Sequence, residues 1–257
     1  MPKKKKQPNN LRNYTVEVLL NNIVDKDIQA ILLPLNLWTN IILCPKYCIK
    51  DNFITPNEFK STIIAIFPTF VVSALYSYHI YELAFQDITL FSKTFTLGCA
   101  IGFMTNYYTN IKHRHNHMTL VLKIQNVHNI LKINGREYIK SNWAAVIAIN
   151  LFYVIMIMYF TLSLNHFRVA DILPTYFVIG FDINVIYASR LLNLLRNDLI
   201  MWMENVNSSG YIGEPDNEAY WIKMFNAFMD IFDAYELIEK IFKNLVSSNK
   251  VGTCIGE

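Results

Sequence analysis

Charged residues are scarce in this chain, and so are glycine, proline and cysteine. Asp, Glu, Lys and Arg make up 17% of the 257 residues, where a soluble domain carries about 25%. Eight glycines, eight prolines and four cysteines are too few for a collagen-like chain, a low-complexity disordered chain or a disulfide-rich secreted module. Because 53% of the residues are hydrophobic, a soluble enzyme would have to disperse them along the chain.

The missing charge is instead concentrated in four segments. Residues 61–81, 94–111 and 141–167 contain no Asp, Glu, Lys or Arg over 21, 18 and 27 positions, and 169–189 is apolar apart from two aspartates. An α-helix needs about 20 apolar residues to cross roughly 30 Å of hydrocarbon. We therefore predict an all-α polytopic membrane protein. Its four transmembrane helices are expected at about residues 61–82, 90–111, 143–165 and 169–189.

The Lys and Arg residues alternate between the connections. Nine precede the first predicted span, and the next four connecting or flanking segments hold none, six, one and six. Cytoplasmic loops carry the excess of positive charge, so both termini are predicted to be cytoplasmic. On this reading, residues 1–60 form a cytoplasmic N-terminal segment, and residues 61–189 form the transmembrane region. A cytoplasmic helical anchor follows at 190–246, then an atypical tail at 247–257.

Two helices in water are expected after the fourth span. The first has an apolar stripe on one face: Leu191, Leu192, Leu195, Leu199 and Trp202. A polar break at 207–217 separates it from the second, whose aromatic residues follow a spacing of 4, 3, 4 and 3: Trp221, Phe225, Phe228, Phe232 and Tyr235. That spacing is typical of a heptad-like seam. We expect this seam to pack against the first helix or against other subunits.

Two aspartates lie on the fourth predicted span. Asp171 and Asp182 are eleven residues apart, or about three helical turns, so both lie on one face. We expect Asp171 at the outer interface. Asp182 lies deeper, where an acidic group either lines a pore or pocket or bonds to a neighbouring helix through groups such as Asn106 or Asn150.

Aromatic residues gather near the outer ends of the spans. Many belong to the interfacial belt of a membrane protein, but an aromatic pocket between helices is also how apolar and heterocyclic ligands are held. Pro174 would loosen the fourth helix close to its outer end. The candidate ligand-binding residues are Phe95, Tyr159, Tyr176 and Phe177.

The histidines of His113-Arg-His115-Asn-His117 form a candidate metal cluster. On a strand the three would face one way and could bind zinc, whereas on a helix His113 and His117 share a face and His115 points away. No cysteine or carboxylate lies nearby in the sequence, so we expect no metal site and favour contact with lipid headgroups. Catalytic motifs are also missing, so no enzymatic activity and no cofactor are expected. The net charge of +3 gives no indication of nucleic-acid binding.

Several segments taken together resemble one family. Leu33-Pro-Leu-Asn-Leu37, Pro45-Lys-Tyr-Cys-Ile49 and Asp51-Asn-Phe-Ile54 resemble the N-terminal signature of insect gustatory receptors of the moth and butterfly type. Gly102-Phe-Met-Thr-Asn-Tyr-Tyr108 resembles the end of that family's second helix, and Arg190-Leu-Leu-Asn-Leu-Leu-Arg196 the start of its cytoplasmic extension. The similarity covers roughly residues 25–245.

The resemblance implies a seven-helix subunit of a tetrameric, ligand-gated cation channel that senses small-molecule tastants at the plasma membrane. It also implies a ligand cavity that opens outward, a pore built by the seventh helix and an inter-subunit anchor formed by the cytoplasmic extensions. After residue 237 the family pattern would enter a fifth span, whereas this chain continues with polar residues and ends at 257. We therefore expect a C-terminally truncated gustatory receptor that joins a homo- or heterotetramer.

Two alternatives stay open at this point. The chain could be a non-conducting four-span scaffold or regulatory subunit that assembles through residues 190–245. It could also be a metal or proton transporter that uses the histidine cluster and Asp182.

Overall fold

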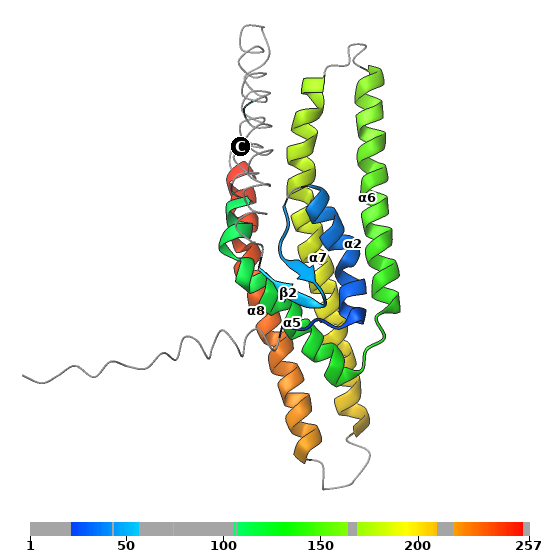
Figure 1. The fold of residues 1–257 in the computed structure, drawn as a ribbon, viewed down its shortest axis with the longest axis vertical. Helices are drawn as coiled ribbons and strands as arrows, with labels where there is room; N and C mark the ends of the chain where they lie inside the picture. The colour runs from blue at the N-terminus through cyan, green and yellow to red at the C-terminus, as the bar shows by residue number, and fades with distance from the viewer. Residues whose placement is uncertain are drawn as a thin grey trace, which may run out of the picture.

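A computed structural model of the chain describes residues 22–42, 44–56, 74, 105, 107–163, 169–209 and 218–253. Within these residues the chain is mostly helical (Figure 1), which confirms the helical class predicted from the sequence. The elements are α2 (Lys26–Ile41), β1 (Cys48–Lys50), β2 (Phe53–Thr55), α5 (Arg114–Leu131), α6 (Arg136–Ser163), α7 (Val169–Ser209) and α8 (Glu218–Thr253).

Helix α7 joins two segments that the sequence analysis separates. Its 41 residues contain both the fourth predicted span and the first predicted cytoplasmic helix, without a break at 189–190. At 1.5 Å per residue it is about 60 Å long. Helix α8, with 36 residues, returns antiparallel along its lower half, while α6 lies beside its upper half (Figure 1). Helix α8 also continues to Thr253, beyond the end predicted for the anchor region.

The N-terminal segment folds into a small unit of α2 and a β-hairpin. The turn between β1 and β2 consists of Asp51 and Asn52, which have φ of 54° and 67°. Two-residue hairpin turns favour this left-handed conformation, which Asp and Asn tolerate better than other residues with a side chain. The chain before α2 runs beside β2, with the Val24 amide donating to the Asn52 carbonyl at 2.7 Å.

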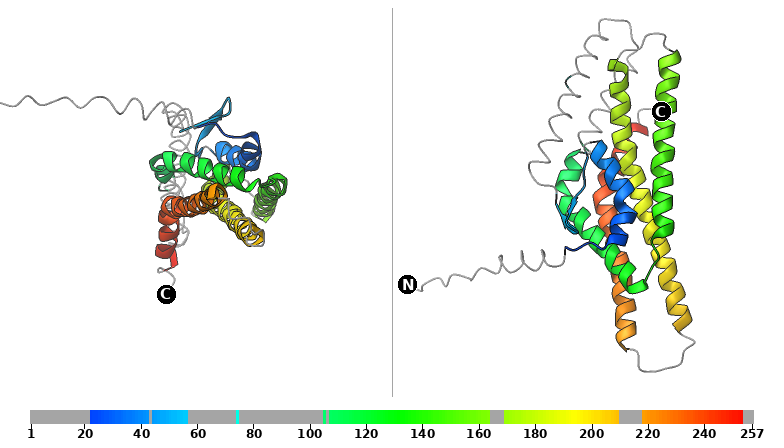
Figure 2. Two further views of the ribbon diagram at one scale, coloured as in Figure 1. Left: turned by 90° about the horizontal axis from the view of Figure 1, so that it is seen from below. Right: turned by 45° about the vertical axis from the view of Figure 1, so that its right-hand side comes forward.

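Side-chain amides hold this N-terminal unit to the other helices. Gln125 of α5 accepts a hydrogen bond from the Asp25 backbone amide at 2.8 Å and donates to the Ile23 carbonyl at 2.9 Å. Asn142 of α6 donates to the Ile31 carbonyl of α2 at 2.8 Å. The view from below in Figure 2 shows α5 running between the N-terminal unit and the α7–α8 pair.

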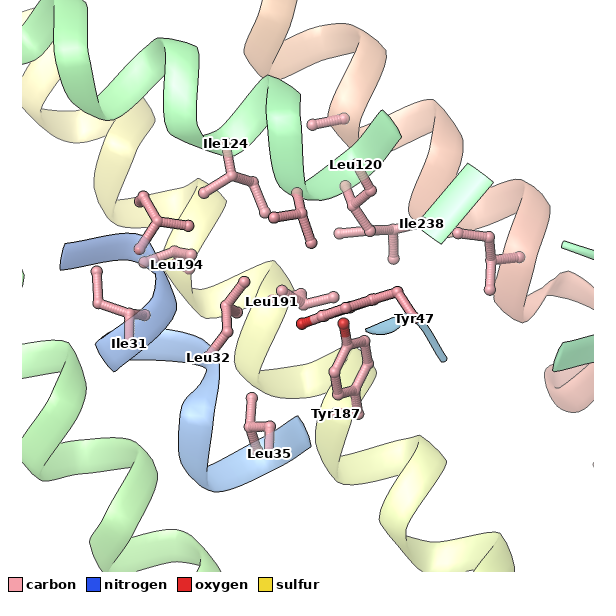
Figure 3. Close-up of a cluster of buried hydrophobic side chains, with 14 of the residues drawn as sticks. Ile31, Leu32, Leu35, Tyr47, Leu120, Ile124, Tyr187, Leu191, Leu194 and Ile238 are labelled. Atoms are coloured by element: carbon pink, nitrogen blue, oxygen red, sulfur yellow. The ribbon is translucent and has the colours of Figure 1, made fainter. Parts of the chain in front are cut away.

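One large hydrophobic core lies where α2, α5, α7 and α8 meet (Figure 3). Its centre consists of side chains with almost no exposed surface: Ile28, Ile31, Leu32, Tyr47, Ile54, Leu120, Ile124, Tyr187 and Leu191. Burying a side chain of this size contributes about 1.5–3 kcal/mol. The hydrophobic effect therefore places the stable centre of the described chain at the junction of the N-terminal unit with the helices.

Helix α6 exposes large apolar side chains along most of its length. Among the described residues it is the one helix long and apolar enough to cross a membrane, over Arg136–Tyr159. Only 17% of the residues in its apolar 18-residue stretch are buried. Of the four predicted spans, the described residues therefore support the third, and they do not support a set of four. The first predicted span, apart from Ala74, and most of the second lie outside the described residues.

The aromatic seam predicted on α8 faces outward. The buried face of α8 consists instead of smaller side chains: Met224, Ala227, Ile231, Ala234 and Ile238. Alanine lets helices approach closely, whereas the rings are too large for that interface. Of the seam residues, Phe228 contacts α7, with its ring centroid 5.0 Å from that of Trp202. The stripe predicted on α7 also shifts, because Leu194 is buried and Leu192 is exposed.

Candidate functional site

The described residues do not show the four predicted ligand-binding aromatic side chains together in one pocket. Phe95 lies outside them, and so do the side chains of Tyr176 and Phe177, although their backbone belongs to α7. Tyr159 lies on α6 with 64% of its surface exposed. The four-residue pocket therefore stays a prediction.

Asp182 lies in a polar contact between α6 and α7. The Tyr153 hydroxyl of α6 donates a hydrogen bond to the Asp182 carboxylate. The expected partner Asn150 instead donates to the Val146 carbonyl of its own helix at 2.8 Å. The predicted bond from Asp182 to a neighbouring helix is present, with Tyr153 as the donor in place of Asn150. Asn106, the other partner named, lies outside the described residues.

The histidine cluster is divided by the start of α5. His113 and His117 are buried on one face of the helix, and His115 is exposed. Burial, together with the charges of Lys46 and His113, lowers the pKa of His117 well below its usual range, so its ring is neutral. Within the described ranges no group of three His, Cys, Asp or Glu residues could hold a metal ion.

Lys46 is the functional candidate that sequence reasoning missed. Its side chain is fully buried, and its Nζ donates to Asn110 Oδ1 at 2.9 Å and to Asn184 Oδ1. The same Nζ lies 4.9 Å from the centroid of the Tyr187 ring and 5.5 Å from that of Phe242. Aromatic faces attract a cation because their quadrupole is negative there. We call these four side chains, Asn110, Asn184, Tyr187 and Phe242, the amine cage.

Three separate parts of the chain build the amine cage, and a fourth part carries Lys46. Lys46 enters between α2 and β1, Asn110 precedes α5, Asn184 and Tyr187 lie one helical turn apart on α7, and Phe242 comes from α8. Asn184 is oriented by its own Nδ2, which donates to the Gly180 carbonyl at 2.8 Å. This bond leaves the oxygen end of the Asn184 amide facing the lysine.

The polar side chains around the cage are also buried. The hydroxyls of Tyr47 and Tyr187 point toward each other (Figure 3). Burial raises the pKa of Tyr47 to about 12 and that of Cys44 to about 11, with the Lys46 charge opposing the shift at Cys44. Burial lowers the pKa of Lys46 to about 7, with Cys44 opposing it, so charged and neutral amine coexist near neutral pH.

A sequence pattern could not have singled out Lys46. Lys46 is one of nine Lys and Arg residues in the N-terminal segment, and in the sequence it looks like the other basic residues that indicate membrane topology. Its partners are 64 and 138 residues away in the sequence. No local periodicity connects residues so far apart.

A buried contact between two ionisable side chains joins α5 to α7. His128 Nε2 lies 3.2 Å from Asp198 Oδ1, and both side chains are buried. Burial raises the pKa of Asp198, and the contact with His128 opposes that shift. Asp198 lies on the apolar stripe of α7, three residues after Leu195, so the helical period could have marked it as a buried acid.

The surface between α5 and α8 is charged but balanced. Lys123 forms ion pairs of 2.7 Å with both Asp230 and Asp233. An open cleft of about 560 Å³ lies beside this contact. It is lined by Thr119, Lys123, Asp233, Glu236, Leu237, Glu239, Lys240 and Lys243. Three cations and three carboxylates line it together, so the cleft favours neither sign of ligand.

Comparisons with known proteins identify no relative that would assign a function to these sites. No family model, no curated protein and no solved structure matches the chain.

Proposed function

We propose that the protein is a gustatory receptor: a plasma-membrane subunit of a ligand-gated cation channel that senses small-molecule tastants. In this proposal the chain crosses the membrane four times at the predicted positions, with its N-terminus in the cytoplasm. Residues 190–246 form the anchor between subunits.

The exposed apolar surface of α6 is the observation that carries the membrane part of the proposal. Its exposed side chains over about four turns are large and apolar: Ile147, Leu151, Phe152, Val154, Ile155, Met158, Tyr159 and Leu162. A soluble protein buries such a helix in its core, because exposing each of these side chains to water costs free energy. A lipid environment removes that cost.

The receptor part of the proposal is supported by where the resembling segments lie. The segments that begin at Leu33, Pro45, Asp51 and Arg190 contribute to a single packed core, through side chains such as Leu35, Tyr47, Ile54 and Leu191. A shared signature that is dispersed in sequence but joined in space is what a common fold would produce. Chance matches on a surface would not be expected to pack together.

The contact between Tyr153 and Asp182 supplies a polar group for ligand binding at membrane depth. Asp182 lies eight residues before Arg190 on α7, or about 12 Å toward the N-terminal end of the helix from the contact that Arg190 makes with Asn142. An ionisable side chain at that depth marks a functional site by default. We assign it to the wall of the tastant pocket, together with the four predicted aromatics.

Membrane topology is tested by glycosylation mapping in microsomes. An extended loop that carries an Asn-x-Thr acceptor, inserted between Asn165 and His166, should be glycosylated, because this connection is predicted to face outward. The natural sequons at Asn13 and Asn207 serve as matched controls on the cytoplasmic side and should stay unmodified. Glycan at Asn13 or Asn207, or none on the inserted loop, contradicts the proposed topology.

The four proposed spans do not include the seventh helix that builds the pore in the resembling family. Channel function is therefore tested by recording current from cells that express this chain together with a complete receptor subunit, while fructose, sucrose, caffeine and strychnine are applied in turn. At least one compound should evoke an inward cation current that cells with the complete subunit alone do not give. Tyr153→Phe and Asp182→Asn should weaken the response several-fold, whereas Lys223→Ser, at an exposed site on α8 outside the aromatic surface, should not. Protein at the cell surface that gives no current with any of these compounds contradicts the channel proposal and favours a scaffold role.

A further inference from the structure

We propose that the amine cage is a binding site for a primary amine, and that Lys46 is its tethered ligand. The N-terminal unit would then be docked onto the rest of the molecule by recognition of one amine head. This inference depends on the geometry of the described residues and holds whether or not the receptor proposal is correct.

The cage matches a primary amine in shape and polarity. Asn110 and Asn184 each turn an amide oxygen toward Nζ, and Tyr187 and Phe242 turn aromatic surface toward it. A primary amine donates hydrogen bonds in more than one direction and, when charged, gains further from the ring faces. Two acceptors and two ring faces around one nitrogen are the elements of an amine site.

Placing a lysine in this buried position costs free energy. Lysine is almost never fully buried unless it is paired, because its charged head loses its hydration. Lysine side chains near an edge usually extend to reach water. The Lys46 side chain does neither, since it is fully buried and its contacts in the described structure are amides and rings. Recognition by the cage offsets the cost of its burial.

The titratable side chains around Lys46 include no carboxylate that would bind the amine in place of the two amide oxygens. Cys44, Tyr47, His117 and Tyr187 are the titratable neighbours whose described side chains approach Lys46. None of them is a carboxylate, and His117 is fully buried, with neither ring nitrogen hydrogen-bonded to a described residue. Because no carboxylate neutralises the amine among these neighbours, the amide oxygens and rings determine its position.

The consequence is a coupling between distant parts of the chain. The cage is complete only when Asn110, α7 and α8 are in their present relative positions. A shift of any of these three would remove an acceptor or a ring from Lys46 and weaken the docking of residues 22–56. The tethered amine therefore links the N-terminal unit to the conformation of the helices.

The test is chemical rescue with the full chain in lipid nanodiscs, followed by the melting temperature from tryptophan fluorescence. Lys46→Ala removes the side chain beyond Cβ, and n-propylamine supplies the missing carbon chain and amine. The variant should melt at a lower temperature than the wild type, and n-propylamine should restore about half of the loss in a saturable manner. The wild type and Lys50→Ala, which removes an exposed lysine four residues away, should not respond.

Equal rescue by 1-propanol would overturn the proposal, because filling the space would then be sufficient. So would a Lys46→Met variant that melts at the wild-type temperature, since methionine keeps most of the volume without the amine.

A second measurement applies if Lys46→Ala cannot be recovered folded. Lys46→Met and Asn184→Leu both keep their volume, and so does the double variant. If the amine head is what Asn184 recognises, the double variant should melt no lower than the more affected single variant. Fully additive losses of melting temperature would contradict the proposal.

Discussion

Two buried ionisable side chains, Lys46 and Asp198, connect segments that are far apart in sequence. Each lies in the part of the molecule that holds the apolar core, and each meets a polar partner from another helix. Leaving such a group without its partner costs about 1–3 kcal/mol or more. Their partners are therefore as important to the fold as the apolar residues around them.

The buried amine predicts a specific dependence of stability on pH. Burial lowers the pKa of Lys46 from its ordinary 10.5 to about 7. Between these values the unfolded chain binds more protons than the folded chain, so stability rises with pH through this window. Below about pH 7 Lys46 is protonated in both states and adds no pH dependence. Relative to Lys46→Met, the wild type should gain on the order of 2 kcal/mol from about pH 7 to about pH 9.

Urea unfolding of both proteins at the two pH values measures this gain. The difference between them is used because Cys44, Tyr47 and His117 also lie against the amine and contribute to the pH dependence of each protein. A difference that stays constant or falls as the pH rises contradicts the assignment.

Gly135, in the turn before α6, predicts a steric effect. A Cβ at this position would lie 2.8 Å from Ile31 Cδ1 and 3.1 Å from Cγ1. Ile31 is completely buried, so it cannot move without disturbing the core. Gly135→Ala should destabilise the protein by about 1–3 kcal/mol, the usual cost of overpacking.

The matched control is Ile31→Val, which removes the closest atom and alone costs about 0.5–1.5 kcal/mol. The double variant should be more stable than the sum of the two single effects predicts. Thermal melts of the four proteins give the coupling, and strict additivity would show that the two residues do not clash.

At the scale of elements, α6 and α8 show how much an apolar pattern can predict. The sequence predicts the positions of both helices, because a long run without charge or with a regular apolar period favours a helix in any surroundings. Which face each helix buries was predicted less well. On α8 the aromatic residues mark the period, but the buried face consists of Ala227, Ala234 and their aliphatic neighbours.

Helix α6 predicts a strong effect of one charge at its middle. Ile155 is an exposed apolar residue in the stretch that could span a membrane. Arginine near the centre of a spanning helix costs about 2.5–3.5 kcal/mol of insertion free energy. Ile155→Arg should therefore reduce the inserted fraction of the protein in microsomes, as measured by resistance to carbonate extraction.

Asn226→Arg adds the same side chain to the exposed surface of α8 and should leave insertion unchanged. If Ile155→Arg inserts as well as this control does, α6 does not cross the membrane as a single exposed helix.

At the scale of the whole molecule, the outward aromatic residues of α8 predict self-association. Trp221, Phe225, Phe232 and Tyr235 are exposed over nearly four helical turns, which is unusual for a surface in water. Replacing Phe225 and Phe232 with serine should shift the assembly from tetramer toward monomer in native mass spectrometry. The melting temperature should change little, because neither ring belongs to the buried core.

Lys223→Ser and Asn226→Ser, on exposed positions of the same helix, are the controls and should leave the assembly intact. An unchanged oligomer in the phenylalanine variant would remove the aromatic residues from the subunit interface.

The helical class and the shared face of His113 and His117 could be predicted from the sequence, because they depend on local period and local charge. Most of the polar break predicted at 207–217 lies outside the described residues, and positions 207–209 belong to α7. Lys46 in its cage, Tyr153 as the partner of Asp182 and the contact between His128 and Asp198 could not be predicted. Each of these depends on the register between two helices, which the packing of the complete core determines.

The uninterrupted course of α7 gives the molecule a lever. From Gly180, beside the amine cage, to Ser209 the helix runs for 30 residues, or about 45 Å. A stiff rod of that length that tilts by about 5° moves its far end by about 4 Å. Near that far end, the Tyr220 hydroxyl of α8 donates to the Asn205 carbonyl of α7 at 3.2 Å. A rotation of about 5° of α7 at the level of Asp182 would therefore displace the far end of the helix by more than the length of that bond.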